Sequence, residues 1–287
     1  MNDSRELTVL LNTIQAAGEA IIKIQQKKFH VIHKANQDPL TEADLLANEI
    51  LKQQLLGSFP EDGWLSEETI DNNKRLSCKR VWLVDPIDGT KEFVKGIPEF
   101  AISVALVENG KPILAAIYNP MTEQLFHALK NQGAWLNGKP IHGHGSTHSS
   151  AQSNTPSNAQ TKLKILASRT EMSDGTWSQF INDKNIDVQP IGSIAYKLGL
   201  VAAGIAHSTF SLGPKSEWDI AAGVLLIEEA GGVVTDKTNQ PFKFNLPNIR
   251  VNGIIAASKE SYQQINQLIQ KAQNVQNSQN VQNADLQ

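Results

Sequence analysis

Two carboxylates lie three positions apart in Asp85-Pro86-Ile87-Asp88-Gly89-Thr90, directly after the apolar run 81–84. The apolar run is typical of a buried strand. Pro86 fixes one backbone dihedral and Gly89 can adopt conformations that a side chain forbids, so we expect a stiff turn after the strand. Two carboxylates held this close repel each other unless a cation, a proton or a base neutralises them. The segment therefore predicts a cation-binding site.

Further acidic residues fall at positions where elements are expected to begin. Glu67 and Glu68 form a pair shortly before the apolar run, Asp44 follows Thr41 in the first turn of a predicted helix, and Asp219 starts another helix. Each has a purely structural explanation. Acidic residues at helix starts are commonly caps, and paired glutamates are usually solvated.

Together with Asp85 and Asp88, these carboxylates favour a hard divalent cation. Mg²⁺ prefers a few carboxylates together with waters and a substrate phosphate. Cys78 is the only cysteine of the chain, which excludes a thiolate metal cluster. Three to five carboxylates around one point would hold two or three Mg²⁺ ions, an arrangement suited to the hydrolysis of a phosphate ester.

The segments 85–90 and 218–223, with the upstream Glu67-Glu68, resemble the signature set of the inositol monophosphatase superfamily. Members of this superfamily are Mg²⁺-dependent, lithium-sensitive phosphomonoesterases. The resemblance extends from about residue 7 to about residue 269. It implies an α+β / α/β fold, a layered α-β-α-β-α sandwich with its site between two halves.

The resemblance also assigns roles to individual residues. The implied metal ligands are Glu67, Asp85, the backbone carbonyl of Ile87, Asp88 and Asp219, with Asp85 bridging two Mg²⁺ ions. A third, weaker ion is implied near Glu67 and Asp44. The implied catalytic residues are Thr90, which orients the attacking water, and Asp44 or Glu67, which assists as base. The implied substrate-binding residues are Glu67, Ile87, Asp88, Gly89, Thr90, Lys197 and Asp219.

Within the superfamily, the chain most resembles the CysQ-type 3′(2′),5′-bisphosphate nucleotidases. Thr90 is followed by Lys-Glu-Phe, where inositol monophosphatases tend to have Asn-Phe, and the runs 100–106 and 118–120 also resemble the nucleotidases. Such enzymes remove the 3′-phosphate of adenosine 3′,5′-bisphosphate (PAP), a by-product of sulfate activation and transfer. Lys197 matches a lysine that lies near the nucleotide in these enzymes; its structural explanation is a solvated helix face.

One departure concerns the substrate. Proteobacterial nucleotidases tend to carry Pro-Arg before the second motif, where this chain has Pro214-Lys215. This puts the nucleotide preference in doubt more than catalysis. Two alternatives therefore stay open: an inositol-1-monophosphatase or sugar-bisphosphate phosphatase on the same scaffold, and a non-enzymatic regulator that binds metal or phosphate.

The bulk composition restricts partners and location. The chain has 287 residues, of which 40% are hydrophobic and 19% charged, and a formal net charge of -3. This balance gives no basic field for nucleic acid, so we expect a small phosphate ester as the partner. No apolar signal core or transmembrane run is apparent, which predicts a cytoplasmic protein. Attachment to the inner membrane surface and a homodimer are both left open.

The expected elements divide the chain into four segments. Residues 1–141 are predicted to form helices on a mainly antiparallel sheet, with a helix over 7–22, another from Thr41, and a hairpin at Asn109-Gly110. Residues 142–162 form a predicted flexible polar insert, whose histidines, His142, His144 and His148, we interpret as solvated rather than metal-binding.

The second half alternates between helix and strand patterns. Residues 163–271 are predicted to form an α/β half, with strands at 163–167, 205–210, near 233 and near 254. Helices are expected at 175–185, 193–203, from Asp219 to Gly231, and from about Lys259. Residues 272–287 repeat Asn, Gln and Val without a core pattern, which predicts a disordered tail.

Overall fold

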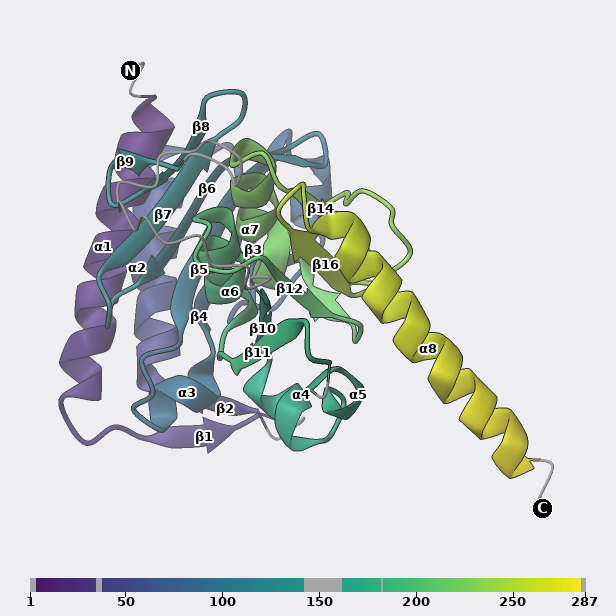
Figure 1. The fold of residues 1–287 in the computed structure, drawn as a ribbon. Coiled ribbons are helices and arrows are strands. Elements are labelled where there is room, and N and C mark those ends of the chain that lie inside the picture. Colours follow the sequence, from purple (N-terminus) through teal and green to yellow (C-terminus); the bar gives the residue numbers. More distant parts are fainter. Residues whose placement is uncertain (1–3, 35–37, 142–161, 182, 285–287) are drawn as a thin grey trace, which may run out of the picture.

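The computed structural model describes residues 4–34, 38–141, 162–181 and 183–284. Its elements stack in five layers, α-β-α-β-α, which run from α1 and α2 across two sheets to α8 (Figure 1). This confirms the predicted layered fold. The predicted polar insert, apart from residue 162, lies outside the described residues, as do its three histidines.

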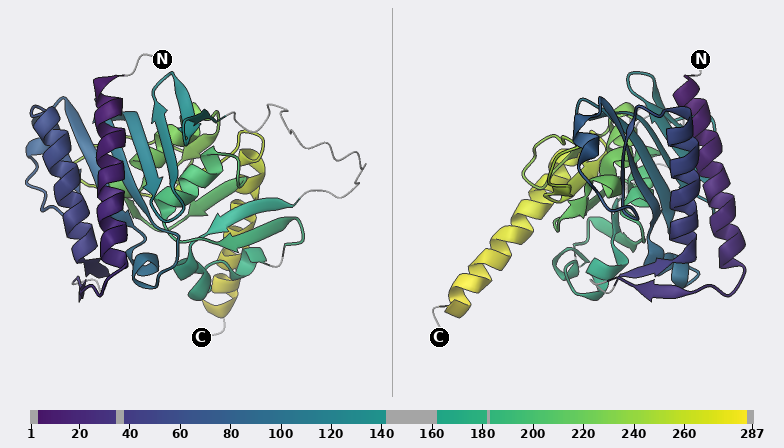
Figure 2. Two further views of the ribbon diagram at one scale, coloured as in Figure 1. Left: turned by 90° about the vertical axis from the view of Figure 1, so that its left-hand side faces the viewer. Right: turned by 180° about the vertical axis from the view of Figure 1, so that it is seen from behind.

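The first layer is an antiparallel pair of helices, α1 (Arg5–Gln25) and α2 (Glu42–Ser58), which lie side by side (Figure 2). Their apolar faces pack with one face of the first sheet, in a core that includes Leu10, Leu51 and Trp82. Among the described residues, α1 is the one helix that is long and apolar enough to span a membrane by length and composition. Its apolar face is instead buried in this core.

The first sheet has seven strands and comes entirely from the first predicted half. All its strand pairs are antiparallel except β3 with β4, which confirms the mainly antiparallel prediction. Asn109 and Gly110 both have positive φ in the β5–β6 hairpin, as the turn pattern predicted. In sheet order, the strands are β3 (Gly63–Ser66), β4 (Arg80–Asp88), β5 (Ala101–Glu108), β6 (Lys111–Asn119), β7 (Gln124–Leu129), β8 (Gly133–Leu136) and β9 (Lys139–Pro140).

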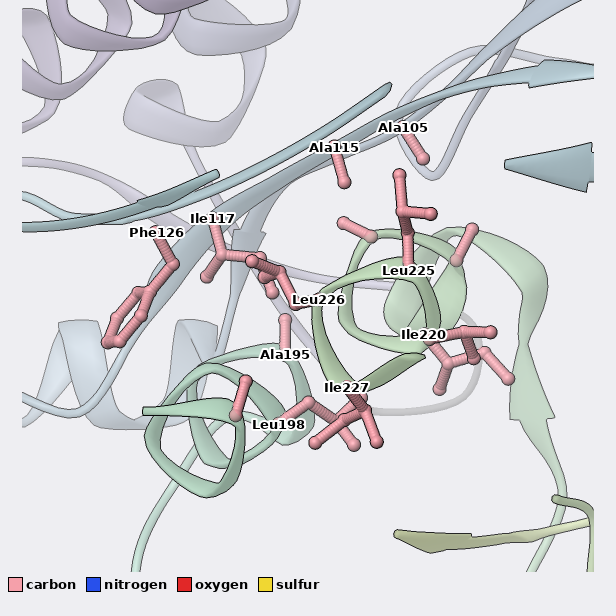
Figure 3. Packing of buried hydrophobic residues seen from close by; sticks show 14 of the residues in the cluster. Ala105, Ala115, Ile117, Phe126, Ala195, Leu198, Ile220, Leu225, Leu226 and Ile227 are labelled. Carbon is pink, nitrogen blue, oxygen red and sulfur yellow. The ribbon is translucent and has the colours of Figure 1, made fainter. Parts of the chain in front are cut away.

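The middle layer consists of α6 (Ile194–Ala202) and α7 (Glu217–Glu229), which separate the two sheets. Their apolar side chains face those of β5, β6 and β7 (Figure 3). Leu166 and Ala256 of the second sheet belong to the same core. The two predicted halves therefore supply one large sheet each but share a core. The helices of this core lie next to the candidate site.

The second sheet has five strands, mixed in direction, in the order β11-β10-β12-β16-β14. Its far face packs against α5 and α8, in a core that includes Trp177, Phe210 and Ile265. The strands are β10 (Leu163–Ala167), β11 (Ile186–Pro190), β12 (Ser208–Ser211), β14 (Val233–Thr235) and β16 (Ile254–Ala257). The shorter elements are β1 (Val31–His33), β2 (Pro39–Thr41), a 3₁₀ turn η1 (Lys74–Ser77), α3 (Thr90–Val94), β13 (Lys215–Ser216) and β15 (Arg250–Val251).

Two predicted elements in the second half differ from the structure. The helix predicted at 175–185 is replaced by α4 (Arg169–Ser173) and α5 (Ser178–Ile181), because Gly175 adopts a left-handed conformation between them. The strand predicted at 205–210 begins only at Ser208. The preceding Gly204 and Ile205 donate their backbone N–H groups to carbonyls in the last turn of α6, so they close that helix instead.

The predicted disordered tail is the largest difference. Helix α8 (Tyr262–Ala284) continues beyond residue 272 and projects from the body of the protein (Figures 1 and 2). The composition lacks a core pattern, but residues 262–284 contain no Gly or Pro to end a helix, and glutamine is a good helix former. Ile265 and Ile269 anchor the start of α8 in the core.

Candidate active site

Strand register brings Glu67 next to Asp85. Strands β3 and β4 pair in parallel with Ser66 opposite Val84, and the N–H of Glu67 donates to the Val84 carbonyl at 3.2 Å. The residues that follow these two partners are therefore neighbours at the end of the sheet. Asp85 is only 2% exposed, and its Oδ1 accepts a hydrogen bond from the N–H of Ile87 at 3.0 Å.

Asp219 reaches the same point from the first turn of α7. Its Oδ2 accepts a hydrogen bond from the N–H of Ser216 at 2.8 Å, so the expected capping role is present. The carbonyl of Trp218 accepts from the hydroxyl of Ser103 at 3.1 Å, and Ser103 lies opposite Asp85 in the β4–β5 register. One tertiary hydrogen bond therefore fixes the start of α7 beside Asp85.

The three carboxylates of Glu67, Asp85 and Asp219 converge, with oxygen atoms that all lie within 4.8 Å of one another. Burial raises the pKa of Asp85 well above its ordinary value, and the charges of Glu67, Asp88 and Asp219 raise it further. Burial, followed by the charge of Asp88, raises the pKa of Asp219 to about 8. An all-oxygen donor set with this much mutual repulsion suits a hard divalent cation such as Mg²⁺.

Thr90 and Asp44 lie together at one side of this cluster. The Thr90 hydroxyl oxygen is 3.1 Å from Asp44 Oδ1 and 3.0 Å from the Ile87 carbonyl oxygen. Asp44 is 1% exposed, and its Oδ2 accepts from both the N–H and the hydroxyl of Thr41, which confirms the predicted capping box. Burial raises the pKa of Asp44. Asp44 thus caps α2 with one oxygen and contacts Thr90 with the other.

Asp88 is held by a different helix, α6. Its Oδ2 accepts from the hydroxyl of Ser193 and from the N–H of Ala195, each at 2.6 Å. Asp88 lines the cleft of the carboxylate cluster, but it is not among the three carboxylates that converge within 4.8 Å. Sequence reasoning missed Ser193: its place just before an apolar helix signals a cap, but nothing local links it to Asp88.

Lys34 is a second residue that the sequence did not indicate. Its Nζ donates to Glu67 Oε1 at 2.7 Å and to Glu68 Oε1 at 2.6 Å. Burial alone would lower the pKa of Lys34, but the two glutamates outweigh it and raise the pKa. Glu68 is therefore a partner in this ion pair, and the solvated-surface explanation does not describe it. Because Lys34 precedes the expected helix in a polar segment, no sequence pattern marks it.

A smaller cavity of about 170 Å³ adjoins the carboxylate cleft and shares Asp88 and Asp219 with it. Two lysines line it, Lys197 and Lys215, together with the hydroxyl-bearing Ser168, Thr170 and Ser211. Lys197 is 3% exposed, so the solvated-helix explanation is wrong for it. Its Nζ donates to the Ile191 carbonyl at 3.1 Å, and burial lowers its pKa to about 8.

Gly89 joins the carboxylate cleft to α3. Its φ of +95° is left-handed, and a Cβ there would lie 3.0 Å from the Glu99 carbonyl oxygen. Only glycine fits this position without strain. The predicted turn is thus present, and α3 begins directly after it at Thr90. The cleft has a volume of about 400 Å³ and is lined by Glu67, Asp85, Ile87, Asp88, Gly89, Thr90 and Asp219, among others.

The five-layer fold with an all-carboxylate centre defines a class of phosphatases, and comparison with known proteins specifies the family. The model of the inositol monophosphatase family matches residues 3–275, so the chain belongs to this family. Inositol monophosphatase 1 of Solanum lycopersicum is 30% identical over 267 residues, which cover 91% of this chain and 94% of that protein.

Other similar proteins carry different names. The 3′(2′),5′-bisphosphate nucleotidase CysQ of Haemophilus influenzae is 30% identical over 246 residues, 85% of this chain and 88% of the relative. The crystal structure of the extragenic suppressor protein suhB from Bartonella henselae superposes with a TM-score of 0.78 at 26% identity, covering 93% of this chain and 99% of that one. The family is therefore established, while relatives with different names are about equally similar.

Proposed function

We propose that the protein is a Mg²⁺-dependent phosphomonoesterase that converts PAP to AMP and phosphate, and that accepts the sulfated analogue PAPS to give APS. The observation that carries this proposal is the cavity of Lys197 and Lys215 beside the carboxylate cluster. A substrate with two phosphates would place one phosphate at the cluster and the other at the lysines. This role belongs to the recycling of nucleotide by-products of sulfur assimilation.

The carboxylate cluster supplies the metal sites of this proposal. Glu67, Asp85 and Asp219 would hold two or three Mg²⁺ ions together with Asp88 and the Ile87 carbonyl. Their oxygen donors, convergence and raised carboxyl pKa values support this assignment. Bound Mg²⁺ would acidify an attacking water and neutralise the charge of the leaving oxygen.

Thr90 would orient the attacking water, and Asp44 would assist as the base that accepts its proton. When the Thr90 hydroxyl donates to Asp44 Oδ1, its lone pairs face away from that bond and can accept a hydrogen bond from water. The raised pKa of Asp44 makes it a better base than an ordinary aspartate. Glu67 is the alternative base, but its Oε1 is engaged by Lys34.

One second candidate has a specific observation in its favour. The similarity to a plant inositol monophosphatase extends over 91% of this chain, so an inositol phosphate, or a sugar bisphosphate, is the competing substrate. An inositol monophosphate has no second phosphate to bind these lysines, of which Lys215 already lies 3.6 Å from Glu171 Oε1. The cavity therefore separates PAP from an inositol monophosphate, whereas a sugar bisphosphate, which has two phosphates, is separated from PAP only by assay.

The test is a panel of substrates assayed for phosphate release with and without Mg²⁺. The panel contains PAP, PAPS, 3′-AMP, inositol 1-phosphate and fructose 1,6-bisphosphate. We expect kcat/KM to be highest for PAP and activity to require Mg²⁺. Millimolar Li⁺ should inhibit. Faster turnover of inositol 1-phosphate than of PAP would reject the substrate assignment, and no turnover of any ester would favour the non-enzymatic regulator.

Substitution of the lysines sharpens this test. Lys197→Met and Lys215→Met should each lower kcat/KM for PAP by about 10- to 100-fold, because a hydrogen bond to a charged group contributes about 1.5–3 kcal/mol. The same variants should leave kcat/KM for 3′-AMP, which lacks the 5′-phosphate, nearly unchanged. Lys139→Met, at an exposed lysine outside both cavities, controls for net charge. Equal losses on PAP and 3′-AMP would argue against a second phosphate site.

A further inference from the structure

An ion pair outside both cavities joins distant segments of the chain. Glu99 precedes β5 and accepts two hydrogen bonds from Arg169, the first residue of α4: from Nε to Oε2 and from Nη2 to Oε1, each at 2.6 Å. Oε2 also accepts from the N–H of Gly192 at 2.8 Å. Partial burial alone would raise the pKa of Glu99, but these bonds outweigh it and lower the pKa. The ionised carboxylate thus holds the turn that precedes α6.

This turn has a conformation that its surroundings must maintain. Ser193 has a φ of +52°, in the left-handed region that residues with side chains rarely adopt. Gly192 is buried, and a Cβ there would lie 2.4 Å from Cγ of Glu92 and 2.7 Å from the Glu99 carbonyl oxygen. The backbone at Gly192 therefore packs against Glu92 and Glu99 more closely than a residue with a Cβ could.

The same turn determines how Asp88 is presented to the cleft. Ser193 Oγ and the N–H of Ala195 both donate to Asp88 Oδ2 at 2.6 Å. Two donors on one oxygen fix the rotation of the carboxylate. Oδ1 has neither of these bonds, and Asp88 lines the carboxylate cleft. A loosened turn would release Oδ2 and allow the carboxylate to rotate.

We infer that Glu99 and Arg169 are a positioning pair for Asp88: they fix the Gly192–Ser193 turn, and the turn orients the Asp88 carboxylate toward the carboxylate cleft. Neither residue lines either cavity, so the pair acts through the turn rather than on the substrate. This inference rests on the proposed role of Asp88 as a metal ligand, but not on the identity of the substrate.

Glu99→Gln tests the pair without changing its volume. The amide loses the charge and turns one acceptor into a donor, which faces either Arg169 or the N–H of Gly192. Asp62→Asn is the matched control, because Asp62 also accepts two bonds from one guanidinium, that of Arg80 at 2.8 and 3.1 Å, and one from a neutral N–H, that of Trp82 at 3.0 Å. Asp62 lines neither cavity.

Two measurements on the substrate-free protein distinguish positioning from stability alone. Hydrogen exchange should become at least about tenfold faster at the amides of 192–195 in Glu99→Gln. Calorimetric titration with Mg²⁺ should give an affinity about tenfold weaker, the usual effect of losing a residue that orients a metal ligand. Asp62→Asn should lower the melting temperature without either change.

Arg169→Gln is a second variant, which tests the pair if Glu99→Gln does not fold. The Arg169 side chain is 37% exposed, so we expect this substitution to be tolerated more easily. It should show the same two changes. Wild-type exchange and wild-type Mg²⁺ affinity in both variants would overturn the inference. Faster exchange with unchanged Mg²⁺ affinity would overturn the link to Asp88. Because no substrate is present, a failure of the PAP assignment leaves these results interpretable.

Discussion

The hydroxyl oxygen of Thr90 lies 3.1 Å from Oδ1 of Asp44, although 46 positions separate the two residues. The contact joins the first residue of α3 to the first turn of α2. It depends on the capping box, because Thr41 binds the other oxygen of Asp44 and fixes the carboxylate. A helix cap therefore also orients the pair that we propose handles the proton of the attacking water.

Removal of the Thr90 hydroxyl should affect the chemical step. Thr90→Val preserves the shape of the side chain, and we expect kcat to fall by about 10²- to 10⁴-fold, the usual contribution of a positioned proton-transfer group. KM should change little. Thr90→Ser keeps the hydroxyl and should retain most of the activity. Steady-state kinetics at saturating Mg²⁺ measure both variants, and a Val variant within tenfold of wild type would remove Thr90 from the mechanism.

Substitutions at Asp44 should separate its cap from its chemistry. Asp44→Asn keeps an oxygen that can accept from Thr41, whereas Asp44→Ala loses the cap at a cost of about 0.5–2 kcal/mol. We expect both variants to lose kcat by at least about 100-fold, because neither can accept a proton. Only the Ala variant should lose stability to this extent in urea unfolding. An active Asn variant would show that Asp44 is a cap alone.

Substitution of Asp219 should abolish turnover and also change the dependence of stability on pH. The folded chain holds the pKa of Asp219 at about 8, chiefly through burial, and the unfolded chain has the ordinary value. Well below pH 4 this carboxyl is protonated in both the folded and the unfolded chain, so it does not change the free energy of unfolding. From pH 4 to about 8 the unfolded state loses its proton first, so this group destabilises the folded protein progressively as pH rises.

Asp219→Asn removes that penalty while it keeps an oxygen for the Ser216 cap. In buffer with a chelator, the melting temperature of the variant should equal that of wild type near pH 4. It should exceed the wild-type value increasingly up to pH 8. Calorimetric melting at four or five pH values measures the difference. A constant or declining difference would contradict the assigned environment of Asp219.

Local patterns in the sequence predicted the carboxylates of the site but not the residues that hold them. Asp85 follows an apolar strand, and Asp44 belongs to a capping box, so both were visible from a few neighbours. Lys34 contacts Glu67 across 33 positions, and Ser193 contacts Asp88 across 105. Such contacts arise only when sheets and helices pack, and no period or turn signal encodes them.

The limits of the fold prediction have the same origin. The hairpin at Asn109-Gly110 and the start of α2 at Glu42 follow from short-range chemistry and were predicted correctly. The strand predicted at 205–210 is present but begins only at Ser208, because Gly204 and Ile205 close α6. Composition also failed for the tail, where a polar segment without glycine or proline continues α8.

Lys34 and Mg²⁺ should compete for the carboxylate of Glu67. Lys34→Met removes the ammonium that is 2.7 Å from Glu67 Oε1, so the half-saturating Mg²⁺ concentration should fall severalfold. Lys91→Met is the control, because Lys91 pairs with Asp38 at 2.8 Å in the same cleft without contact to a proposed ligand. Activity measured across a Mg²⁺ titration gives the half-saturating concentration of the wild type and of each variant. An unchanged or higher half-saturation would mean that Lys34 does not compete.

The low pKa of Lys197 should make recognition of the second phosphate dependent on pH. Burial lowers this pKa to about 8, so the ammonium is charged below pH 8 and becomes neutral as pH rises through it. Because kcat/KM reports ionisation in the free enzyme, the value for PAP should fall above pH 8, by as much as about tenfold per unit. Dividing it by the value for 3′-AMP cancels ionisations that both substrates share, such as those of the metal ligands. The control variant keeps a positive charge at this position. In Lys197→Arg the guanidinium stays charged, so the ratio of the kcat/KM values for PAP and 3′-AMP should stay constant from pH 7 to 10.

A ratio that is constant in the wild type, or that falls equally in both proteins, would exclude Lys197 as the group that binds the second phosphate.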